Sequence, residues 1–461
     1  MKAVLAAPMV GLAVLVGVAS PAHAHVASKP PNVVVIVTDD ERYDANATMK
    51  SVHRLLAAHG VTFTEFHVTT SECCPGRASM LTGQYSHHHH VVGNFGKTGY
   101  PQFDESNTLA TWLSGAGYST ALVGKYLNDY TIYGNHHVPP GWRTWIAMDS
   151  VPEEKYYNYT LNVDRQLVHH GRAAKDYSTT VFSNQAAHYL QTAKEPFFLY
   201  YAPIAPHLPA IPAPTDVGAL HSLPPMHEPS FDERNISDKP WRAWHSRTLS
   251  EGGVDYVQDE IRKRQLESLR AVDRSVARLV SVLRRRGTLD RTVIFYVSDN
   301  GFLLGEHRLG GKIWPYEESM HVPLIVRTPW TTVPSRDDHF VLNTDLATTI
   351  ADLAGVSPGR PQDGRSLVPL LHGRSPAWRV DFLEEYRGQP LLPEGGPPRF
   401  KAVHDRRFLY VEYDNGWREL YDHRVDPYEL RSVANVPKYA GYQARLARRL
   451  HALYTAPARP S

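Results

Sequence analysis

Residues 32–40 read NVVVIVTDD, and this stretch decides the fold class. Its apolar and β-branched run, six residues from Val33 to Thr38, predicts a strand buried on both faces of a parallel sheet. Asp39 and Asp40 follow at the carboxyl end of that strand, which is where open α/β sheets bind ligands. A solvated turn with a helix-capping aspartate is the alternative that this segment alone leaves open.

The same design recurs further along the chain. The other predicted strands lie at residues 292–301, 196–202 and 322–326. The first runs into Asp299 and Asn300, and the second leads to His207. The proline of the third favours a strand end or an edge. Helical periodicity, clearest over residues 266–283 and weaker over 108–115 and 343–354, alternates with these strands. The alternation predicts an α/β sandwich in which helices flank a large, mostly parallel central sheet.

The sequence pattern differs at both ends of the chain from that of the alternating strands and helices. Past residue 361, short segments such as 407–413 and a basic amphipathic helix at 442–454 predict a smaller C-terminal α+β subdomain, residues 361–461, with an antiparallel sheet. Residues 205–250, rich in Pro, His and Trp, predict a long functional excursion without regular structure. Residues 1–24 resemble a secretory signal peptide.

Composition excludes several classes of function. The net charge is +2, with 42% hydrophobic and 21% charged residues, which is ordinary for a globular protein and predicts no nucleic-acid partner. The N-terminal apolar run is shorter than the roughly 20 residues that span a bilayer, so we expect no stable membrane anchor. The mature chain is expected to be exported, to an extracellular, periplasmic or lysosome-like compartment depending on the host.

Residues 73–83, CCPGRASMLTG, hold the only two cysteines of the chain. A disulfide between adjacent cysteines is strained, so a structural bridge explains them poorly. Residues 75–82 predict a short helix with Gly83 as its stop, which places Cys73 at the helix N-terminus and Arg77 one turn further on the same side. The pattern indicates a reactive centre at Cys73, whereas Cys74 is expected to take no part.

Oxygen donors and lysines accompany this centre. Four side chains at two strand ends, Asp39, Asp40, Asp299 and Asn300, form a set that favours a hard cation such as Ca²⁺ or Mg²⁺. Lys125 and Lys312 each follow a glycine, as a lysine reaching into a tight site can, although an exposed surface position is the alternative. For the four histidines at 87–90 we weigh a transition-metal site, a substrate-facing loop and an exposed polar turn.

These motifs resemble the signatures of type I sulfatases, within the alkaline-phosphatase-like superfamily. Cys73-x-Pro75-x-Arg77 followed by Leu81-Thr82-Gly83 is similar to the first signature, and residues 117–125 are similar to the second. The Asp39-Asp40 pair, Ala205-Pro206-His207 and residues 298–301 follow in the family's order. The resemblance is strong over residues 30–330 and implies a catalytic domain at 30–360.

Within the family, the chain resembles the N-acetylglucosamine-6-sulfatase subgroup. The stretches that carry this likeness are residues 73–79, 124–128, 140–142 and 155–161. The last two form either part of a substrate pocket or packing positions. The chain departs from many members at two places, with Gly76 where they have Ser or Ala and Leu127 where they have His. The second departure implies that the leaving-group acid is His207.

The resemblance implies a reaction and a cofactor set. A formylglycine-generating enzyme would convert Cys73 to Cα-formylglycine, whose hydrate attacks sulfur with help from Asp299 and a cation. The cation would be Ca²⁺, with Mg²⁺ possible, and its implied ligands are Asp39, Asp40, residue 73, Asp299 and Asn300.

Other residues would bind and position the substrate. Lys125, Lys312 and His207 would bind it, with the lysines on the sulfuryl oxygens and His207 protonating the departing alcohol. Arg77 would hold residue 73 and the ligand carboxylates.

The expected function is therefore hydrolysis of a sulfate ester, on a sulfated sugar such as a 6-sulfated N-acetylglucosamine of a glycosaminoglycan. One alternative is a phosphonate or phosphate diester hydrolase on the same scaffold. The other is an inactive carbohydrate-binding relative, against which the intact Cys73, both lysines and the four oxygen donors speak.

Overall fold

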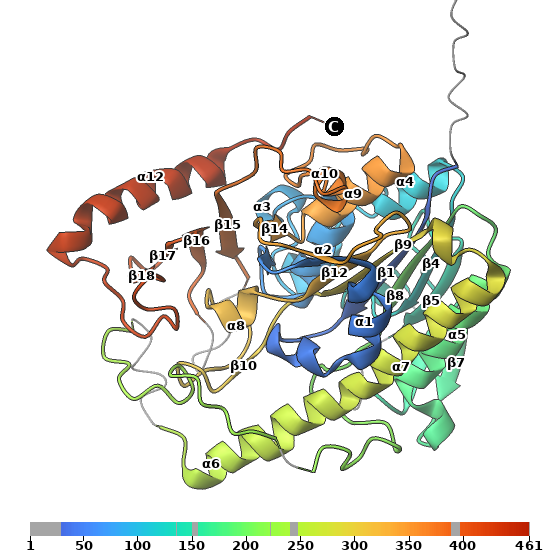
Figure 1. Cartoon of the computed structure of the whole chain (residues 1–461), viewed down its shortest axis with the longest axis horizontal. Helices are drawn as coiled ribbons and strands as arrows, with labels where there is room; N and C mark the ends of the chain where they lie inside the picture. The colour runs from blue at the N-terminus through green and yellow to red at the C-terminus, as the bar shows by residue number, and fades with distance from the viewer. Residues whose placement is uncertain are drawn as a thin grey trace, which may run out of the picture.

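The computed structural model describes residues 29–134, 136–149, 155–221, 223–239, 248–388 and 397–460. The expected signal peptide, residues 1–24, lies outside the described residues. Two packed parts are visible in Figure 1, a large central sheet with helices on both faces and a smaller sheet beside it under the last helix.

The strand predicted at residues 32–40 forms β1 (Asn32–Thr38), in the interior of a ten-stranded sheet. The sheet has the order β13 (Ser335–Asp337), β2 (Gly60–Phe63), β12 (Leu324–Arg327), β9 (Thr292–Ser298), β1, β8 (Phe197–Ala202), β4 (Ser119–Gly124), β5 (Thr144–Met148), β6 (Tyr159–Val163) and β7 (Gln166–His170). β9, β1, β8, β4 and β5 run parallel to one another, so their carboxyl ends share one edge. β12 and β6, the strands on either side of this group, are antiparallel to it. The predicted fold class is confirmed, although the antiparallel β6–β7 edge was not predicted.

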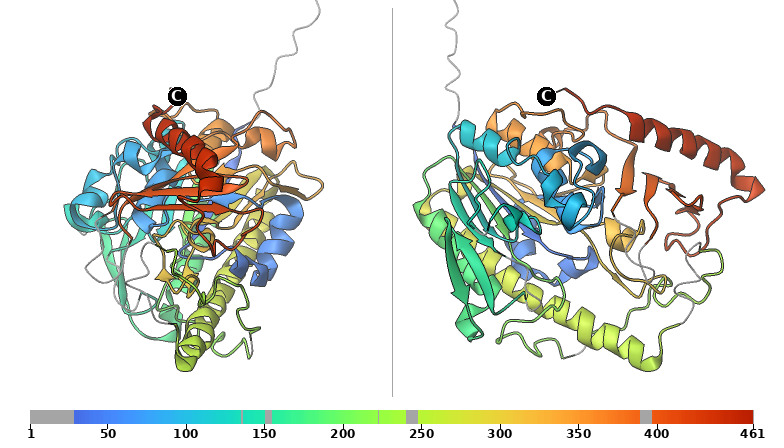
Figure 2. Two further views of the ribbon diagram at one scale, coloured as in Figure 1. Left: turned by 90° about the vertical axis from the view of Figure 1, so that its left-hand side faces the viewer. Right: turned by 180° about the vertical axis from the view of Figure 1, so that it is seen from behind.

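Each central strand buries both faces, which explains its continuous apolar sequence. Val33 and Val35 of β1 join one core layer, and Val34 and Ile36 join the other. The first layer is covered by α2 (Cys73–Thr82), α3 (Ser86–His89), α4 (Leu109–Gly115), α9 (Asp345–Ala354) and α10 (Val368–Leu371). The second layer is covered by α1 (Lys50–Leu55), α5 (Ser178–Thr192) and α7 (Lys263–Arg286). Two shorter elements run directly into α7: α6 (Glu251–Asp255) and the π-helical η7 (Tyr256–Arg262). Figure 2 shows the long α7 along one face of the sheet.

The helix predicted at 266–283 is confirmed as part of α7, which ends at Gly287 in the left-handed conformation (φ +72°). β12 lies inside the sheet, between β2 and β9, and Pro323 precedes its first residue rather than marking an edge. Within the described parts of residues 205–250, no helix or strand forms, as expected. In the part of the chain that the structure describes, none of the helices combines the length and apolarity needed to cross a membrane.

The C-terminal region forms the predicted antiparallel sheet, of β15 (Asp381–Tyr386), β16 (Phe400–Asp405), β17 (Phe408–Tyr413) and β18 (Arg418–Asp422). α12 (Ala440–Thr455) packs on one face through Leu446 and Leu450. The other face packs against Leu309, Trp314 and Tyr316, which flank Lys312. Several short elements lie outside the central sheet and the small sheet: β3 (Phe66–His67), β10 (Leu303–Leu304), β11 (Gly310–Gly311), α8 (Glu317–Met320) and β14 (Val341–Leu342). The small sheet therefore supports the segment that carries Lys312.

Truncation of Leu446 tests the docking of α12. Leu446 is fully buried, so Leu446→Ala removes apolar contacts and leaves a cavity, which we expect to lower the free energy of unfolding by about 2–5 kcal/mol. Arg448→Ala, on the exposed side of the same helix, should change it by no more than about 0.5 kcal/mol. Urea unfolding followed by circular dichroism measures both. Equal stability of the two variants would contradict this packing.

Candidate active site

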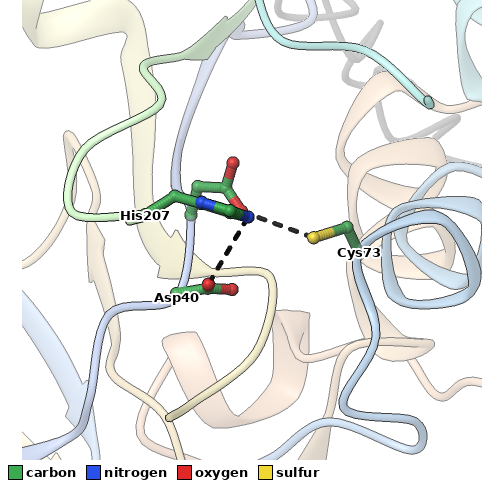
Figure 3. A group of neighbouring side chains, drawn as sticks. Asp40, Cys73 and His207 are labelled. Atoms are coloured by element: carbon green, nitrogen blue, oxygen red, sulfur yellow. Dashed lines mark hydrogen bonds and ion pairs between the residues drawn. The ribbon is translucent and has the colours of Figure 1, made fainter. Parts of the chain in front are cut away.

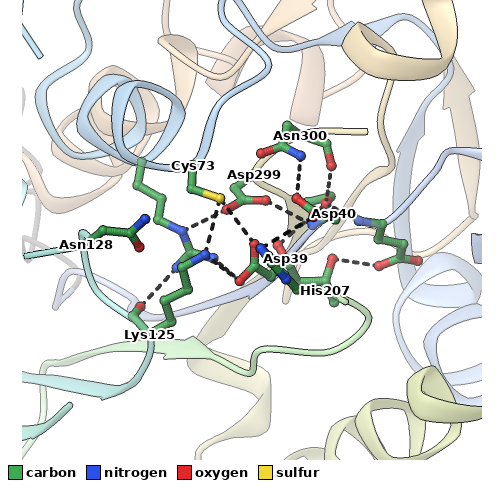
Figure 4. Close-up of polar contacts among 12 residues, drawn as sticks. Asp39, Asp40, Cys73, Lys125, Asn128, His207, Asp299 and Asn300 are labelled. Atoms are coloured by element: carbon green, nitrogen blue, oxygen red, sulfur yellow. Dashed lines mark hydrogen bonds and ion pairs between the residues drawn. The ribbon is translucent and has the colours of Figure 1, made fainter. Parts of the chain in front are cut away.

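The shared edge of the parallel strands collects the predicted polar residues. Asp39 and Asp40 follow β1, Asp299 and Asn300 follow β9, and Lys125 follows β4. Backbone hydrogen bonds continue the sheet past the strand ends, from Asp299 N to Thr38 O (3.1 Å) and from Lys125 N to Ala202 O (2.8 Å). Figure 4 shows these side chains converging on Cys73. The predicted proximity of the strand ends is confirmed.

Cys73 is the first residue of α2, which begins two residues earlier than predicted and ends before Gly83 in the left-handed conformation. Its side chain is buried, and its Sγ lies 2.8 Å from Lys312 Nζ, 3.2 Å from Lys125 Nζ and 3.5 Å from Asp39 Oδ1. Both cysteines are free thiols. Burial raises the pKa of the Cys73 thiol to about 12 despite the two lysines, so the thiol is protonated at neutral pH and is a poor nucleophile.

Arg77 holds the site together from within α2. Its Nε donates to Asp299 Oδ2 (2.8 Å) and its Nη1 donates to the backbone oxygen of Lys125 (2.9 Å). Its Nη2 lies 3.9 Å from Asp39 Oδ2, and the side chain is buried. The planar guanidinium thus contacts three separate segments in fixed directions, which is the geometry that the predicted positioning role of Arg77 requires.

The carboxylates differ in their ionisation. Burial opposes the charge of Asp39 and of Asp40, but neighbouring cations outweigh it, chiefly Lys125 for Asp39 and Lys312 for Asp40, and hold both pKa values below the ordinary range. For Asp299, burial and the charge of Asp39 together raise the pKa to about 6 despite Arg77. Two firmly charged carboxylates therefore stand beside one that titrates near neutrality.

Lys312 reaches the same edge from the loop after β11. Its Nζ contacts Asp40 Oδ1 and lies 3.3 Å from Asn300 Oδ1, while Asn300 Nδ2 donates to Asp40 Oδ1 (2.7 Å). Asp40 itself has a left-handed backbone (φ +67°), which is uncommon for a residue other than glycine. Lys125 and Lys312 are thus site residues and not surface lysines.

The donor set fits a hard divalent cation. Three buried carboxylates, of Asp39, Asp40 and Asp299, and the amide of Asn300 offer oxygen ligands, and the cysteine beside them remains a neutral thiol. Ligand atoms of Asp39, Asp40, Cys73 and His207 lie within 4.8 Å of one another. The chemistry of these groups supports the predicted ligand assignment, in which Ca²⁺ or Mg²⁺ would bind.

His207 faces Asp40 and Cys73 (Figure 3), and its side chain is 19% exposed. Its Nε2 is 3.7 Å from Asp40 Oδ2, and its Nδ1 is 2.7 Å from the backbone oxygen of Leu208. Lys155 Nζ lies 2.8 Å from the same Nδ1, so the carbonyl favours a proton on this nitrogen whereas the ammonium group favours a lone pair. Nε2 is the nitrogen that faces Asp40. Burial lowers the pKa of His207 to about 4, although Asp40 and Asp39 act in the opposite direction. The pKa near neutrality expected for a leaving-group acid is therefore absent, and the ring is neutral at pH 7.

Lys155 belongs to the stretch 155–161, for which the sequence leaves a substrate pocket and packing open, and no catalytic role is predicted for it. Its Nζ lies 2.8 Å from His207 Nδ1 and 3.3 Å from Nε2, and burial lowers the pKa of this lysine. The rest of its stretch packs inward, since Tyr156, Tyr159 and Leu161 are buried, and so is Trp142 of residues 140–142. The packing interpretation therefore holds for those side chains, although Tyr156 Oη also donates to the backbone oxygen of His207 (2.7 Å). Lys155 is the residue of this stretch that contacts the His207 ring.

Both departures from the family pattern have structural counterparts. A Cβ on Gly76 would lie 2.9 Å from the backbone oxygen of Asp299, so glycine permits the close approach of α2 to the end of β9. Leu127 is buried in the first core layer and offers no proton.

Cys74 lies beside the site, where its Sγ accepts a hydrogen bond from Asn128 N (3.0 Å). Its thiol thus anchors the segment after Lys125.

Three of the histidines at 87–90 lie in α3 (Ser86–His89) and not in a loop or an exposed turn, whereas His90 follows the helix and is exposed. His87 Nδ1 contacts Glu385 (2.9 Å) of the small sheet, and His88 Nδ1 contacts Asp363 (2.8 Å). His89 is buried and lies 3.0 Å from Ser79 Oγ. His87 thus ties α3 to the small sheet, while His88 and His89 contact Asp363 and Ser79, and for these three residues the contacts replace both expectations. The metal-site hypothesis finds no support either, since within the described ranges they join no group with metal-binding spacing.

Known proteins show the same combination of fold and motifs. The "Sulfatase" family model matches residues 31–356, and the model "N-sulphoglucosamine sulphohydrolase, C-terminal" matches residues 305–456. Human N-acetylglucosamine-6-sulfatase is 37% identical over 380 residues, covering 78% of this chain and 68% of that protein. The extracellular sulfatase SULF-1 homolog of Drosophila melanogaster is 36% identical over 375 residues, with 78% of this chain but only 33% of its own length covered.

A solved structure of a protein in complex with its substrate D-glucosamine-2-N,6-O-disulfate matches with a TM-score of 0.79 and 25% identity, covering 92% of this chain and 97% of that one. The predicted resemblance to the N-acetylglucosamine-6-sulfatase subgroup is confirmed by these matches. Since the family model covers most of its length, the chain belongs to the sulfatase family, a family of sulfuric ester hydrolases.

Proposed function

We propose that this chain removes the 6-O-sulfate of a sulfated N-acetylglucosamine or a similar glycosaminoglycan sugar, and that it does so after export from the cell. The observation that carries the proposal is the pair of ammonium groups, of Lys125 and Lys312, that flank Cys73 Sγ at 3.2 and 2.8 Å. Two cations beside one buried reactive position form a receptor for the oxygens of a sulfuryl group. The sugar assignment rests on the likeness to human N-acetylglucosamine-6-sulfatase and to the glucosamine-disulfate complex.

The nucleophile would come from Cys73. A formylglycine-generating enzyme would convert its thiol to an aldehyde, and the hydrated aldehyde supplies a hydroxyl that attacks sulfur. The present Sγ stands where the aldehyde oxygen would be. Asp299 would accept the proton of the attacking hydroxyl, because its pKa of about 6 gives it base strength near neutral pH. Arg77 would hold Asp299 in place through the 2.8 Å bond to Oδ2.

Asp39, Asp40, Asp299 and Asn300 would hold the cation, calcium or in its place magnesium, which supplies positive charge to the nucleophile and to the sulfuryl oxygens. Lys125 and Lys312 would bind the sulfuryl oxygens from opposite sides of residue 73. Their charge is secure, because Asp39 and Asp40 respectively keep both lysine pKa values above the ordinary range despite burial. The site would therefore stabilise negative charge on the transferring group without rearrangement.

The leaving sugar hydroxyl needs a proton, and two side chains face the open side of the site. His207 Nε2 is the candidate predicted from the sequence. Lys155 is the second, because it touches the same ring and its pKa is lowered by burial. Their side chains lie at the solvent side of the site, where a sugar can approach, whereas Cys73 and the carboxylates are buried. His207 is favoured because it also contacts Asp40 of the ligand set.

Replacement of Cys73 tests the nucleophile. Cys73→Ala should lower kcat by about 10³-fold or more, because no hydroxyl remains to attack sulfur. Cys74→Ser is the matched control, since a serine oxygen can also accept the hydrogen bond from Asn128 N, and we expect it to keep most of the activity. Peptide mass spectrometry of active wild-type protein should show a loss of about 18 Da at position 73, as conversion of thiol to aldehyde requires. Full activity with an unmodified Cys73 would exclude this nucleophile.

The pH profile identifies the proton donor. Burial lowers the pKa of His207 to about 4, so its protonated form is lost as pH rises through that value. If His207 is the acid, kcat/KM should stay level over about pH 4–6, where loss of the His207 proton is offset by ionisation of the base Asp299, and should fall above about pH 6. His207→Gln should lower the rate and abolish that falling limb. A falling limb that survives in His207→Gln, lies at alkaline pH and disappears in Lys155→Gln would instead make Lys155 the donor.

Substrate class is tested by side-by-side rates. We expect the enzyme to cleave 6-sulfated N-acetylglucosamine faster than the same sugar sulfated at other positions, and faster than a phosphate or phosphonate diester of similar size. Defined saccharides with release of sulfate or phosphate measured directly give the comparison. A dominant diesterase rate would establish the alternative hydrolase, and equal sulfate release from every position would refute the 6-O-specificity.

A further inference from the structure

A second group of histidine and carboxylate side chains lies outside the active site. It comprises His67 of β3, Glu317 at the start of α8 and His404 of β16, whose ligand atoms all lie within 4.8 Å of one another. None of these residues belongs to the group around Cys73. The three side chains come from segments far apart in sequence, and the fold brings them together where the small sheet meets the central part of the molecule.

His67 is the most unusual member of this group. Its side chain is only 1% exposed, yet neither ring nitrogen makes a hydrogen bond. Nε2 faces Glu317 Oε2 at 3.5 Å. A buried imidazole without a hydrogen-bond partner is unfavourable, and such groups are uncommon in folded proteins. His67 therefore points an unpaired ring nitrogen at a carboxylate.

His404 shows the arrangement of a histidine oriented for metal binding. Its Nδ1 lies 3.2 Å from Glu384 Oε1, within hydrogen-bond distance, and its Nε2 lies 3.4 Å from Glu317 Oε1. A histidine that binds a metal commonly donates its other ring N–H to a carboxylate, which fixes the tautomer and the direction of the free lone pair. Glu384 would be that carboxylate, since it is buried and pairs with His404 Nδ1, the nitrogen that does not face Glu317.

The spacing of the donors also fits an ion. Glu317 contacts three histidines, at 3.5 Å to His67, 3.4 Å to His404 and 3.4 Å to His321, and all three distances exceed the roughly 2.7–2.9 Å of a charge-assisted hydrogen bond. They match the distance of about 3.3–3.4 Å between two ligands of a tetrahedral ion with bonds of about 2.0–2.1 Å. The Glu317 side chain is 32% exposed, so an ion could enter from solvent and keep a water as a further ligand.

We propose that His67 Nε2, His404 Nε2 and the Glu317 carboxylate bind one divalent transition ion of the zinc type. Two imidazoles and a carboxylate suit zinc, whereas the all-oxygen set of the active site suits a hard cation, so the two sites select different metals.

The position of this site indicates a structural role. His67 precedes Cys73 by six residues, and Glu317 follows Lys312 by five. His404 belongs to the small sheet. A bound ion would therefore connect the small sheet to the segments that deliver the nucleophile position and the sulfate-binding lysine. It would stabilise the junction without touching the substrate.

Zinc binding by the whole chain tests this inference. Protein stripped with a chelator and dialysed against excess calcium, which fills the hard-cation site, is titrated with zinc by calorimetry. We expect one zinc equivalent per chain and a rise of the thermal midpoint. Glu317→Gln and His67→Asn should each weaken zinc binding by more than about tenfold, because each removes a ligand. His339→Gln, which breaks a histidine–aspartate contact elsewhere, should bind zinc as the wild type does.

The second control separates the two sites. His207→Gln removes a member of the active-site group, and we expect it to retain the zinc equivalent. Absence of zinc binding in the wild type would show that His67, His404 and Glu317 form a buried ion-pair network with His321 instead. Zinc lost in His207→Gln but retained in Glu317→Gln would place it in the active site and overturn the inference. Should His67→Asn fail to fold, Glu317→Gln decides, since its partly exposed side chain keeps its shape.

Discussion

Three carboxylates, of Asp39, Asp40 and Asp299, are buried at one edge of the sheet, and their charge must be compensated inside the protein. Transfer of an unpaired carboxylate from water to the interior is strongly unfavourable, so the fold has to bring cations to them. It does so from three elements: Arg77 from α2, Lys125 from the end of β4 and Lys312 from the loop after β11. The packing of α2 and of that loop against the sheet is thus a condition for burying the acids.

The same requirement explains why the small sheet belongs to the active site. Lys312 lies in a loop with little regular structure of its own, but Trp314 and Tyr316 beside it are buried against the small sheet. Ile313 N donates to Ser71 Oγ (3.1 Å), which ties this loop to the segment before Cys73. The C-terminal family model begins at residue 305 and includes Lys312. A domain boundary at residue 360 remains a prediction from the change in sequence pattern. Side chains from both sides of that boundary pack together, since Trp314 and Tyr316 contact the small sheet.

Sequence alone predicts the part of the site that strand ends define. Continuous apolar runs predict parallel strands, and parallel strands end at one edge, so Asp39, Asp40 and Asp299 could be placed together before any coordinates. Lys155 could not, because it lies in an irregular stretch with a left-handed backbone (φ +47°) and no periodicity marks it. The edge strand β7 also escaped prediction, since its side chains are largely exposed and form no apolar run. His67 sits in a two-residue strand, where one polar residue carries no signal.

A neutral side chain at position 73 leaves the positive charge of Lys125 and Lys312 available for a sulfate ester. A thiolate there would be held by Lys125 and Lys312, and it would consume the positive charge that a sulfate ester needs on binding. Burial prevents this by raising the pKa of the thiol to about 12, so that both lysines remain available while the residue is uncharged. An aldehyde hydrate, as proposed, is likewise neutral until a base removes its proton. Because Asp299 titrates near pH 6, that proton would be lost only when the attack occurs, and negative charge would then develop between two lysines already in place.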